Sequence, residues 1–291
     1  QIEYLEQEGH FPCVLHSHQI HMDQVTIDTT LSSQFASALL MAGALLPDGI
    51  KVTMTGSRTA GSYIKMTLSM MEQFGIRIKT EKDGYSIPGS QSFGLDHYMI
   101  EPDVSGACYF YTMAPLLGVD VLVRGVHEKS LQGDIRYVQL MQKLGCRLED
   151  GPEGILLAGR DVSHFPGISV DMKDFSDQTM TMAVLAVFAD SDTEITNIGH
   201  IRVQESDRLS AILTELSHLG IACEEIPEKD GLRIHPGCPK SGLVHTYEDH
   251  RMAMAFTLIG LRIPGIVIDN PGCCGKTFEN YFDLIDSLYE P

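Results

Sequence analysis

The chain has few basic residues and no long apolar run, and both shortages narrow what it can do. Its 291 residues include 21 Lys and Arg against 39 Asp and Glu, which gives a formal net charge of −18. This balance argues against bulk electrostatic attraction to a nucleic-acid backbone or an anionic membrane surface. No stretch approaches the roughly 18 uninterrupted apolar residues of a membrane span. An acidic chain can still bind an anion, but only at a locally arranged site.

Disulfide and secretion patterns are also missing. The seven cysteines are scattered without a C-x-x-C pair, and the first nine residues are acidic and polar rather than basic and then apolar. We therefore expect a reduced, cytoplasmic protein that binds neither nucleic acid nor membrane, while its oligomeric state stays open. With 43% apolar residues, the chain can bury the core of one large domain or two ordinary ones.

Internal periodicity is the most informative feature that is present. Four segments share a polar or acidic start followed by an uncharged run rich in Ala, Met and Leu. Aligned at Ser32, Ser105, Ser176 and Asp249, they lie 73, 71 and 73 residues apart. These apolar runs predict helices over 35–46, 106–119, 178–189 and 252–261.

Each repeat adds a second, amphipathic helix, predicted over 64–74, 135–144, 208–219 and 277–288. The first three of these end before a glycine, Gly75, Gly145 or Gly220, as helices often do. Short β-rich stretches lie between the helices, at 51–54, 121–123, 193–198 and 265–268. The repeat therefore predicts an α/β (α+β) fold of β-α-β-α-β-β units. The first helix of each unit, apolar all round, should be buried, and the second should cover it.

The polar residues at the starts of the apolar helices have two explanations. They could be ordinary N-caps, which satisfy free N–H groups of a helix. They could equally line an anion site, because a helix N-terminus carries a partial positive charge. The residues concerned are Ser32, Asp103, Ser105, Asp174 and Asp249. Position alone does not choose between a cap and a ligand.

Two stretches carry more charged residues than the capping of a helix requires. Residues 202–209 crowd Glu, Asp and two Arg at a helix start, and 249–255 place a His-Arg pair before an uncharged helix. An arginine beside a buried apolar helix is costly unless an anionic partner pairs with it. Together with Lys276, these residues predict a site for phosphate or carboxylate groups.

The combination of these motifs resembles that of the EPSP synthase family, the 3-phosphoshikimate 1-carboxyvinyltransferases. The resemblance runs over the whole chain and rests on Gln132-Gly133-Asp134, on 202–208, on 249–255, and on Lys276-Thr277-Phe278 followed by Tyr281-Phe282. It implies the inverse α/β fold of enolpyruvyl transferases, with six units in two domains and the active site between them. Four units are present here, so we expect 1–99 to be a partial N-terminal domain and 100–291 the C-terminal domain. We further expect the chain to lack its N-terminal portion and to be poorly active or inactive alone.

The implied reaction moves the carboxyvinyl group of phosphoenolpyruvate to the 5-hydroxyl of shikimate 3-phosphate and releases phosphate. It belongs to the shikimate pathway of aromatic amino acid biosynthesis and needs no cofactor or metal. The reaction requires a base near the hydroxyl, an acid for the methylene carbon, and cations for two phosphates and a carboxylate.

The resemblance assigns a role to individual residues. Asp177 would accept the hydroxyl proton, and Glu205 and Lys276 would transfer protons at the phosphoenolpyruvate carbon. The implied catalytic set is Asp177, Glu205, Lys276 and His250. The implied substrate-binding set is Ser32, Ser33, Gln34 and Tyr63 for shikimate 3-phosphate, with Gln204, Arg208 and Arg251.

Three positions depart from the family pattern. Gln204 stands where the family commonly has lysine, His200 where it has asparagine, and Ala60 where it has serine. Simpler explanations also exist for two of the implied residues. Glu205 could be a helix-start acid, as Asp207 is expected to be, and His250 could be a structural histidine.

Alternative functions stay open at this stage. The chain could be a non-catalytic relative that only binds anions, although an acid-base set is unnecessary for binding. It could also be an enolpyruvyl transferase for a UDP-sugar, which shares the fold and the chemistry. A weaker hypothesis is a zinc site, because His16, His18 and His21 lie within six residues.

Overall fold

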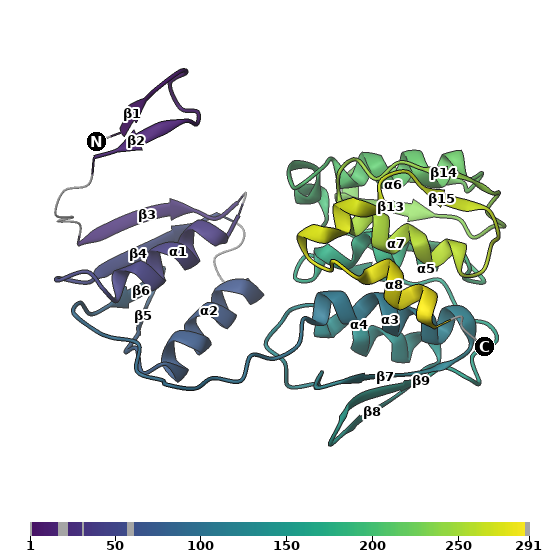
Figure 1. The fold of residues 1–291 in the computed structure, drawn as a ribbon, viewed down its shortest axis with the longest axis horizontal. Coiled ribbons are helices and arrows are strands. Elements are labelled where there is room, and N and C mark those ends of the chain that lie inside the picture. Colours follow the sequence, from purple (N-terminus) through teal and green to yellow (C-terminus); the bar gives the residue numbers. More distant parts are fainter. Residues whose placement is uncertain (1, 17–22, 31, 57–60, 289–291) are drawn as a thin grey trace. The chain divides into compact units, whose positions relative to one another are not determined.

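The computed structural model describes residues 2–16, 23–30, 32–56 and 61–288 of the chain (Figure 1). The chain divides into two compact units, Gln1–Tyr98 and Met99–Pro291. Each unit has its own hydrophobic core, and the two cores share no residue. The boundary expected from the sequence followed residue 99.

The first unit is one four-stranded sheet with two helices, preceded by a small hairpin. Its elements are β1 (Ile2–Tyr4), β2 (Cys13–Leu15), β3 (Gln24–Asp28), α1 (Gln34–Gly43), β4 (Ile50–Thr55), α2 (Ser62–Gln73), β5 (Lys79–Glu81) and β6 (Gly84–Ile87). The sheet has the order β3-β4-β6-β5, with β3 parallel to β4 and β6 antiparallel to both of its neighbours. In β4 the side chains alternate between buried and more exposed positions, as in a sheet with one covered face.

The second unit contains three sheets and six α-helices among the described residues. Its first half comprises α3 (Val104–Leu117), β7 (Asp120–Arg124), α4 (Ile135–Leu140), the 3-10 helix η1 (Met141–Leu144), β8 (Arg147–Gly151), β9 (Gly154–Ala158), β10 (Ser169–Asp171), η2 (Ser176–Gln178), α5 (Thr179–Ala186) and β11 (Thr193–Thr196). The second half comprises η3 (Gly199–Val203), α6 (Arg208–His218), β12 (Cys223–Ile226), η4 (Pro227–Lys229), β13 (Gly231–Ile234), β14 (Gly242–Val244), α7 (His250–Gly260), β15 (Ile266–Ile268), η5 (Pro271–Lys276) and α8 (Tyr281–Ser287).

The predicted repeat is confirmed by sheet topology. The sheet β10-β11-β13-β12 has the same strand order and the same directions as β3-β4-β6-β5 in the first unit. The remaining two sheets, β7-β9-β8 and the parallel pair β14-β15, match parts of the same pattern. In the two four-stranded sheets, one sequence period therefore corresponds to one parallel pair and one antiparallel hairpin.

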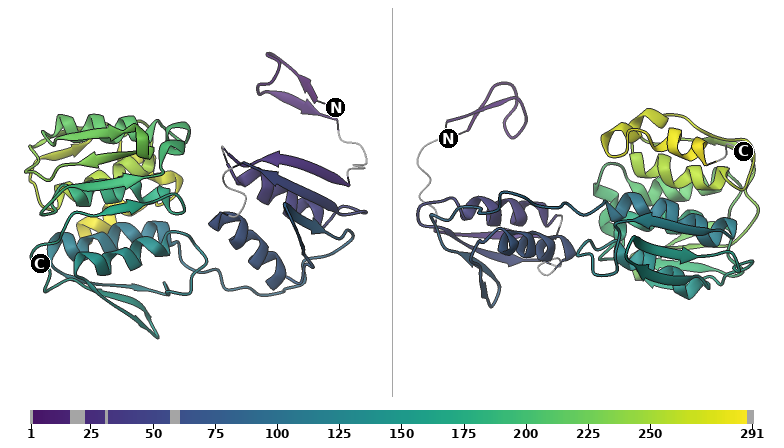
Figure 2. Two further views of the ribbon diagram at one scale, coloured as in Figure 1. Left: turned by 180° about the vertical axis from the view of Figure 1, so that it is seen from behind. Right: turned by 60° about the horizontal axis from the view of Figure 1, so that its bottom comes forward.

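The apolar helices of the second unit form its interior. Helices α3, α5 and α7 pack against one another, with sheets on the outside (Figures 1 and 2). Every residue of α5 is buried, and α3 is buried along nearly its whole length. Burial of a large apolar side chain contributes about 1.5–3 kcal/mol, so these helices supply much of the unit's stability.

Helix α1 departs from the prediction that each apolar helix is buried all round. It buries Ala36, Leu40 and Gly43, but Phe35 and Met41 are exposed. Among the described residues of the first unit, α1 packs against α2 and the sheet, whereas α3, α5 and α7 surround one another. An all-apolar sequence identifies a buried helix only where enough neighbouring elements exist to cover it.

Helix ends agree with the sequence in part. The glycines after α2, η1 and α6 adopt positive φ angles of 84°, 92° and 82°, as a glycine cap requires. The last helix, predicted over 277–288, begins late: α8 starts at Tyr281, and the 3-10 turn η5 (Pro271–Lys276) lies before the predicted start. The difference lies directly after Lys276, a predicted functional residue that ends η5.

Candidate active site

The second unit gathers the predicted charged residues at the starts of successive helices. Asp177 precedes α5, Glu205 and Arg208 stand at the start of α6, and Arg251 lies in the first turn of α7. These segments follow β10, β11 and β14, whose parallel pairings are β10-β11 and β14-β15. A helix that follows a parallel strand begins at the carboxyl-end edge of the sheet. Its free N–H groups and their partial positive charge therefore lie at that edge.

Arg208 is the centre of this ion cluster, defined as Asp177, Glu205, Arg208, Asp249, Arg251 and Lys276. Its guanidinium donates through Nε to Asp249 Oδ2 at 2.7 Å and through Nη2 to Asp249 Oδ1 at 3.3 Å. It further contacts Asp177 Oδ1 at 3.2 Å, Glu205 Oε2 at 2.9 Å, and the Gln204 side-chain carbonyl. The fork of five N–H donors is thus fully used by groups of the protein.

Arg251 and Lys276 are more accessible than Arg208. The side chains of Arg208, Arg251 and Lys276 are 1%, 14% and 59% exposed. Arg251 Nη2 lies 2.9 Å from Asp177 Oδ2, so Asp177 is held between two arginines. Both arginines thus lie within ion-pair distance of one carboxylate group.

Glu205 and Lys276 form the outer edge of the ion cluster. Lys276 Nζ donates to Glu205 Oε1 at 3.0 Å, across 71 residues of sequence. Burial by itself raises the pKa of Glu205, but the charge of Arg208 and the Lys276 hydrogen bond outweigh burial and the net shift is downward. A carboxylate and an ammonium in contact with each other make a pair suited to proton exchange with a ligand.

Asp249 has two functions in the structure. Its side chain accepts from the Arg251 N–H at 2.9 Å as the N-cap of α7, and it also pairs with Arg208. Burial alone would raise its pKa, but the Arg208 hydrogen bonds and charge outweigh burial and lower it. The sequence left open whether Asp249 is an N-cap or a ligand. In the structure it is an N-cap that also pairs with Arg208.

His250 is buried beside the ion cluster. Its Nδ1 lies 3.8 Å from Asp249 Oδ1, which is too long for a hydrogen bond, and the atom has no hydrogen-bond partner among the described residues. Burial lowers the pKa of His250, and the charge of Arg251 lowers it further. The imidazole is therefore neutral near neutral pH.

Of the other candidate N-cap residues, two cap a helix through their side chains and two have different side-chain partners. Asp103 caps α3 by accepting from the Ser105 N–H at 2.9 Å, and Asp207 caps α6 by accepting from the Ser210 N–H at 3.0 Å. Ser105 and Asp174 have side-chain partners elsewhere. The Ser105 hydroxyl donates to buried Asp134, and Asp174 pairs with Arg136.

Asp134 belongs to a buried polar network that the sequence analysis did not identify. Its carboxylate accepts from Ser105 and, at 3.1 Å, from Gln178 Nε2, the side chain next to Asp177. Burial raises the pKa of Asp134, and the nearby Asp177 charge raises it further. The Gln132-Gly133-Asp134 motif contained the signal, because Gln132 also accepts from the Val104 N–H at the start of α3.

The predicted phosphate-binding residues of the first unit lie at its own helix starts. Ser32 Oγ accepts from the Gln34 N–H at 3.1 Å, and Ser33 is the N-cap residue of α1. Tyr63 lies in the first turn of α2 and is half-exposed. The two helices are joined one turn further on, where Thr67 Oγ donates to Ser37 Oγ at 2.9 Å.

Other predicted positions have different outcomes. His200 Nε2 lies 2.7 Å from Ser176 Oγ, beside the segment that carries Asp177. His16 contacts Glu3 at 2.8 Å, whereas Ala60, His18 and His21 lie outside the described residues. Within the described ranges no three His, Cys, Asp or Glu side chains are grouped to hold a metal ion. The seven cysteines, all described, are free thiols.

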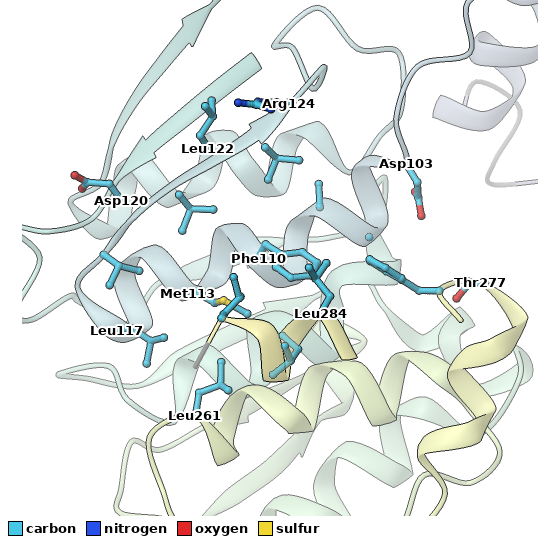
Figure 3. A pocket seen from close by; sticks show the side chains of 18 residues that line it. Asp103, Phe110, Met113, Leu117, Asp120, Leu122, Arg124, Leu261, Thr277 and Leu284 are labelled. Carbon is cyan, nitrogen blue, oxygen red and sulfur yellow. The ribbon is translucent and has the colours of Figure 1, made fainter. Parts of the chain in front are cut away.

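An apolar cavity of about 1040 Å³ also lies in the second unit (Figure 3). Side chains of α3, β7 and α8 line it, including Phe110, Met113 and Leu284. None of the predicted site residues is in its lining. Its apolar walls do not suit the charged chemistry of the ion cluster.

Among the described residues, no helix is both long and apolar enough to cross a membrane.

The fold identifies the class of protein to which this chain belongs. The fold is shared with enolpyruvyl transferases: a solved EPSP synthase from Acinetobacter baumannii superposes with a TM-score of 0.77 at 23% identity, covering 99% of this chain and 67% of that one. The family model for EPSP synthase (3-phosphoshikimate 1-carboxyvinyltransferase) matches residues 1–285. The chain belongs to the EPSP synthase family, a family of transferases of the shikimate pathway.

Relatives at higher identity carry the same name. The 3-phosphoshikimate 1-carboxyvinyltransferase of Nostoc punctiforme is 37% identical over 290 residues, which cover 99% of this chain and 67% of the relative. That of Edwardsiella ictaluri is 37% identical over 294 residues, covering 100% of this chain and 67% of the relative. The chain thus spans about two thirds of the length of these relatives.

Proposed function

We propose that this chain transfers the carboxyvinyl group of phosphoenolpyruvate to the 5-hydroxyl of shikimate 3-phosphate, with the ion cluster as its catalytic centre. The observation that carries the proposal is the position of Asp177, 3.2 Å from Arg208 and 2.9 Å from Arg251, next to the Glu205–Lys276 pair. A base, an acid-base pair and cations occur together in the second unit, as the reaction requires.

In the addition step, Asp177 accepts the hydroxyl proton while that oxygen attacks C2 of phosphoenolpyruvate. The Glu205–Lys276 pair delivers a proton to C3, which gives a tetrahedral intermediate. In the elimination step, a methyl proton returns to the same pair and the C2–O bond to phosphate breaks. The departing phosphate takes the proton that Asp177 had accepted, and the enol ether forms. Protons and bonds balance over the two steps, and no cofactor is needed.

Cation placement suits the binding of phosphoenolpyruvate. Arg251 and Lys276 are accessible to a ligand, and anion binding would release Arg208 donors from Gln204 and Glu205. His250, neutral and buried beside Arg251, would offer a further polar contact. Gln204 would serve as a hydrogen-bonding group and not as a charge, because an amide replaces the usual lysine.

The first unit would hold shikimate 3-phosphate. We assign its phosphate to Ser32, Ser33 and Gln34 at the start of α1, where hydroxyls and free N–H groups can surround an anion. Tyr63 would contact the ring. In this assignment Gln1–Tyr98 corresponds to part of the family's N-terminal domain, and Met99–Pro291 corresponds to its C-terminal domain.

A single-turnover assay tests the function. The chain, in excess over shikimate 3-phosphate, is mixed with phosphoenolpyruvate, and the product is followed by phosphorus NMR so that slow turnover is visible. We expect Asp177→Asn to slow product formation by about 100-fold or more, the usual contribution of a general base. Asp174→Asn is the matched control, because Asp174 lies three residues earlier and pairs with Arg136; it should react within threefold of the unmodified chain.

Two outcomes would contradict the proposal. Equal rates for Asp177→Asn and the unmodified chain would remove Asp177 from catalysis. An unmodified chain that binds phosphoenolpyruvate without forming any product would favour the second candidate, a relative that binds anions without catalysis.

A further inference from the structure

Tyr109 is a buried phenol that the proposed reaction leaves unexplained. It lies in the second turn of α3 and is 1% exposed. Its ring packs edge to face on Tyr281, with ring centroids 5.8 Å apart and an interplanar angle of 70°. The hydroxyl oxygen is buried and has no hydrogen-bond partner among the described residues.

An unpartnered buried hydroxyl is unfavourable, because desolvation is not compensated by a hydrogen bond. The other buried tyrosines show the ordinary solution. Tyr111, two residues further along α3, donates to the Ile155 carbonyl at 3.0 Å, and Tyr281 donates to the Met254 carbonyl at 3.0 Å. A phenylalanine would pack as well at position 109 without this cost, so the hydroxyl calls for another reason.

The surroundings of the Tyr109 hydroxyl supply that reason. Burial raises its pKa most strongly, and Arg251 opposes this rise both by its charge and as a hydrogen-bond donor. The charges of Asp177 and Arg208 also act on this hydroxyl, Asp177 raising its pKa and Arg208 lowering it. Helix α3, which carries Tyr109, packs against α7, which carries Arg251, so the buried hydroxyl lies close enough to the ion cluster to feel the charge of Arg251.

We propose that Tyr109 is a positioning residue for Arg251, whose N–H group it accepts from the interior when Arg251 binds an anion on its accessible side. The proposal rests on the assignment of Arg251 to ligand binding. Arg251 lies 2.9 Å from Asp177 in the present structure, and a ligand carboxylate or phosphate would compete for that donor edge. A hydroxyl behind the guanidinium would then fix its plane, which a two-pronged interaction with an anion requires.

The test is Tyr109→Phe, which keeps the ring and removes only the oxygen. We expect calorimetric titration with phosphoenolpyruvate to show about 3- to 10-fold weaker binding, the usual loss for one hydrogen bond. The melting temperature should stay equal or rise, because an unpartnered polar group is removed. Tyr111→Phe is the matched control on the same helix; it should lower the melting temperature and leave phosphoenolpyruvate affinity unchanged.

A second readout separates this proposal from the proposed function. In ¹⁵N NMR spectra with inorganic phosphate as the probe, the Arg251 side-chain signal should move differently in Tyr109→Phe and in the unmodified chain. If the unmodified chain binds no phosphoenolpyruvate, the proposed function fails, and the phosphate-dependent Arg251 signal alone decides the role of Tyr109. Identical Arg251 signals in both proteins, or a Tyr109→Phe chain that loses stability as Tyr111→Phe does while keeping its affinity, would overturn the proposal.

Discussion

At the scale of single residues, Arg208 illustrates how one side chain can organise a site. Its five donors are divided among Asp249, Asp177, Glu205 and Gln204, from three different helix starts. A buried ion pair of this kind adds little net stability relative to apolar packing, but removal of one partner leaves uncompensated charge. The arginine therefore specifies the geometry of the ion cluster more than it adds to stability.

Replacement of Arg208 by leucine should be strongly destabilising. Asp249, fully buried, would lose its charged partner, and we expect the free energy of unfolding to fall by about 3–5 kcal/mol. Urea unfolding followed by circular dichroism measures this change. Arg233→Leu is the control, because Arg233 also pairs with two carboxylates, Glu194 and Glu224, but is 32% exposed; its loss should cost less than about 1 kcal/mol. Equal losses in the two variants would contradict this account of Arg208.

At the scale of elements, the starts of α6 and α7 are tied together by Asp249. The carboxylate caps α7 and binds Arg208 at the start of α6. Its pKa in the folded chain lies below its ordinary value of 3.8. Folding is therefore favoured by ionisation of Asp249 at pH values above about 4, and this contribution is lost as the pH falls through the lowered pKa.

This linkage predicts the pH dependence of an Asp249→Asn variant. Asparagine keeps the N-cap but carries no charge, so the variant should be less stable than the unmodified chain at pH 7. Between pH 5 and pH 2, roughly the window in which an ion-paired carboxylate is protonated, its stability should fall less steeply. The measurement is urea unfolding at a series of pH values. Asp207→Asn serves for comparison, since Asp207 also caps a helix but is 44% exposed. Parallel pH profiles for Asp249→Asn and the unmodified chain would rule the linkage out.

Local sequence signals predicted the elements well where the cause is local. The charge-free runs indicated α3, α5 and α7, and glycines marked the ends of α2, η1 and α6 through their positive φ angles. The start of α8 was placed four residues early, because residues 277–280 do not join the helix. The exposure of α1 was missed because burial depends on the neighbours that surround a helix, which its own sequence does not encode.

The site could be predicted as a set of residues but not as a set of contacts. Arginines next to an apolar helix require anionic partners, and that argument led to Arg208, Arg251 and Lys276. Which partner each would take depends on how the units stack: Arg208 meets Asp249 across 41 residues, and Arg251 meets Asp177 across 74. Tyr109 was not identified at all, because a tyrosine in an apolar run has the signature of ordinary core.

At the scale of the whole molecule, repetition explains how an acidic chain can handle anions. The net charge of −18 belongs to the surface as a whole, whereas three cations come together locally, Arg208 and Arg251 at helix starts and Lys276 in the turn η5. Repulsion of a ligand by distant surface charges is screened beyond about 8–10 Å at ordinary ionic strength. The local field at the ion cluster therefore decides whether an anion binds.

The most direct test of this account is calorimetric titration of phosphoenolpyruvate into the unmodified chain and into Arg251→Lys. The account predicts one bound ligand per chain and binding weaker by about tenfold or more in the variant, because lysine keeps the charge but not the planar two-pronged donor. The melting temperatures of the two proteins should agree closely. Equal affinities, or no binding by the unmodified chain, would contradict the claim that the ion cluster is the anion site.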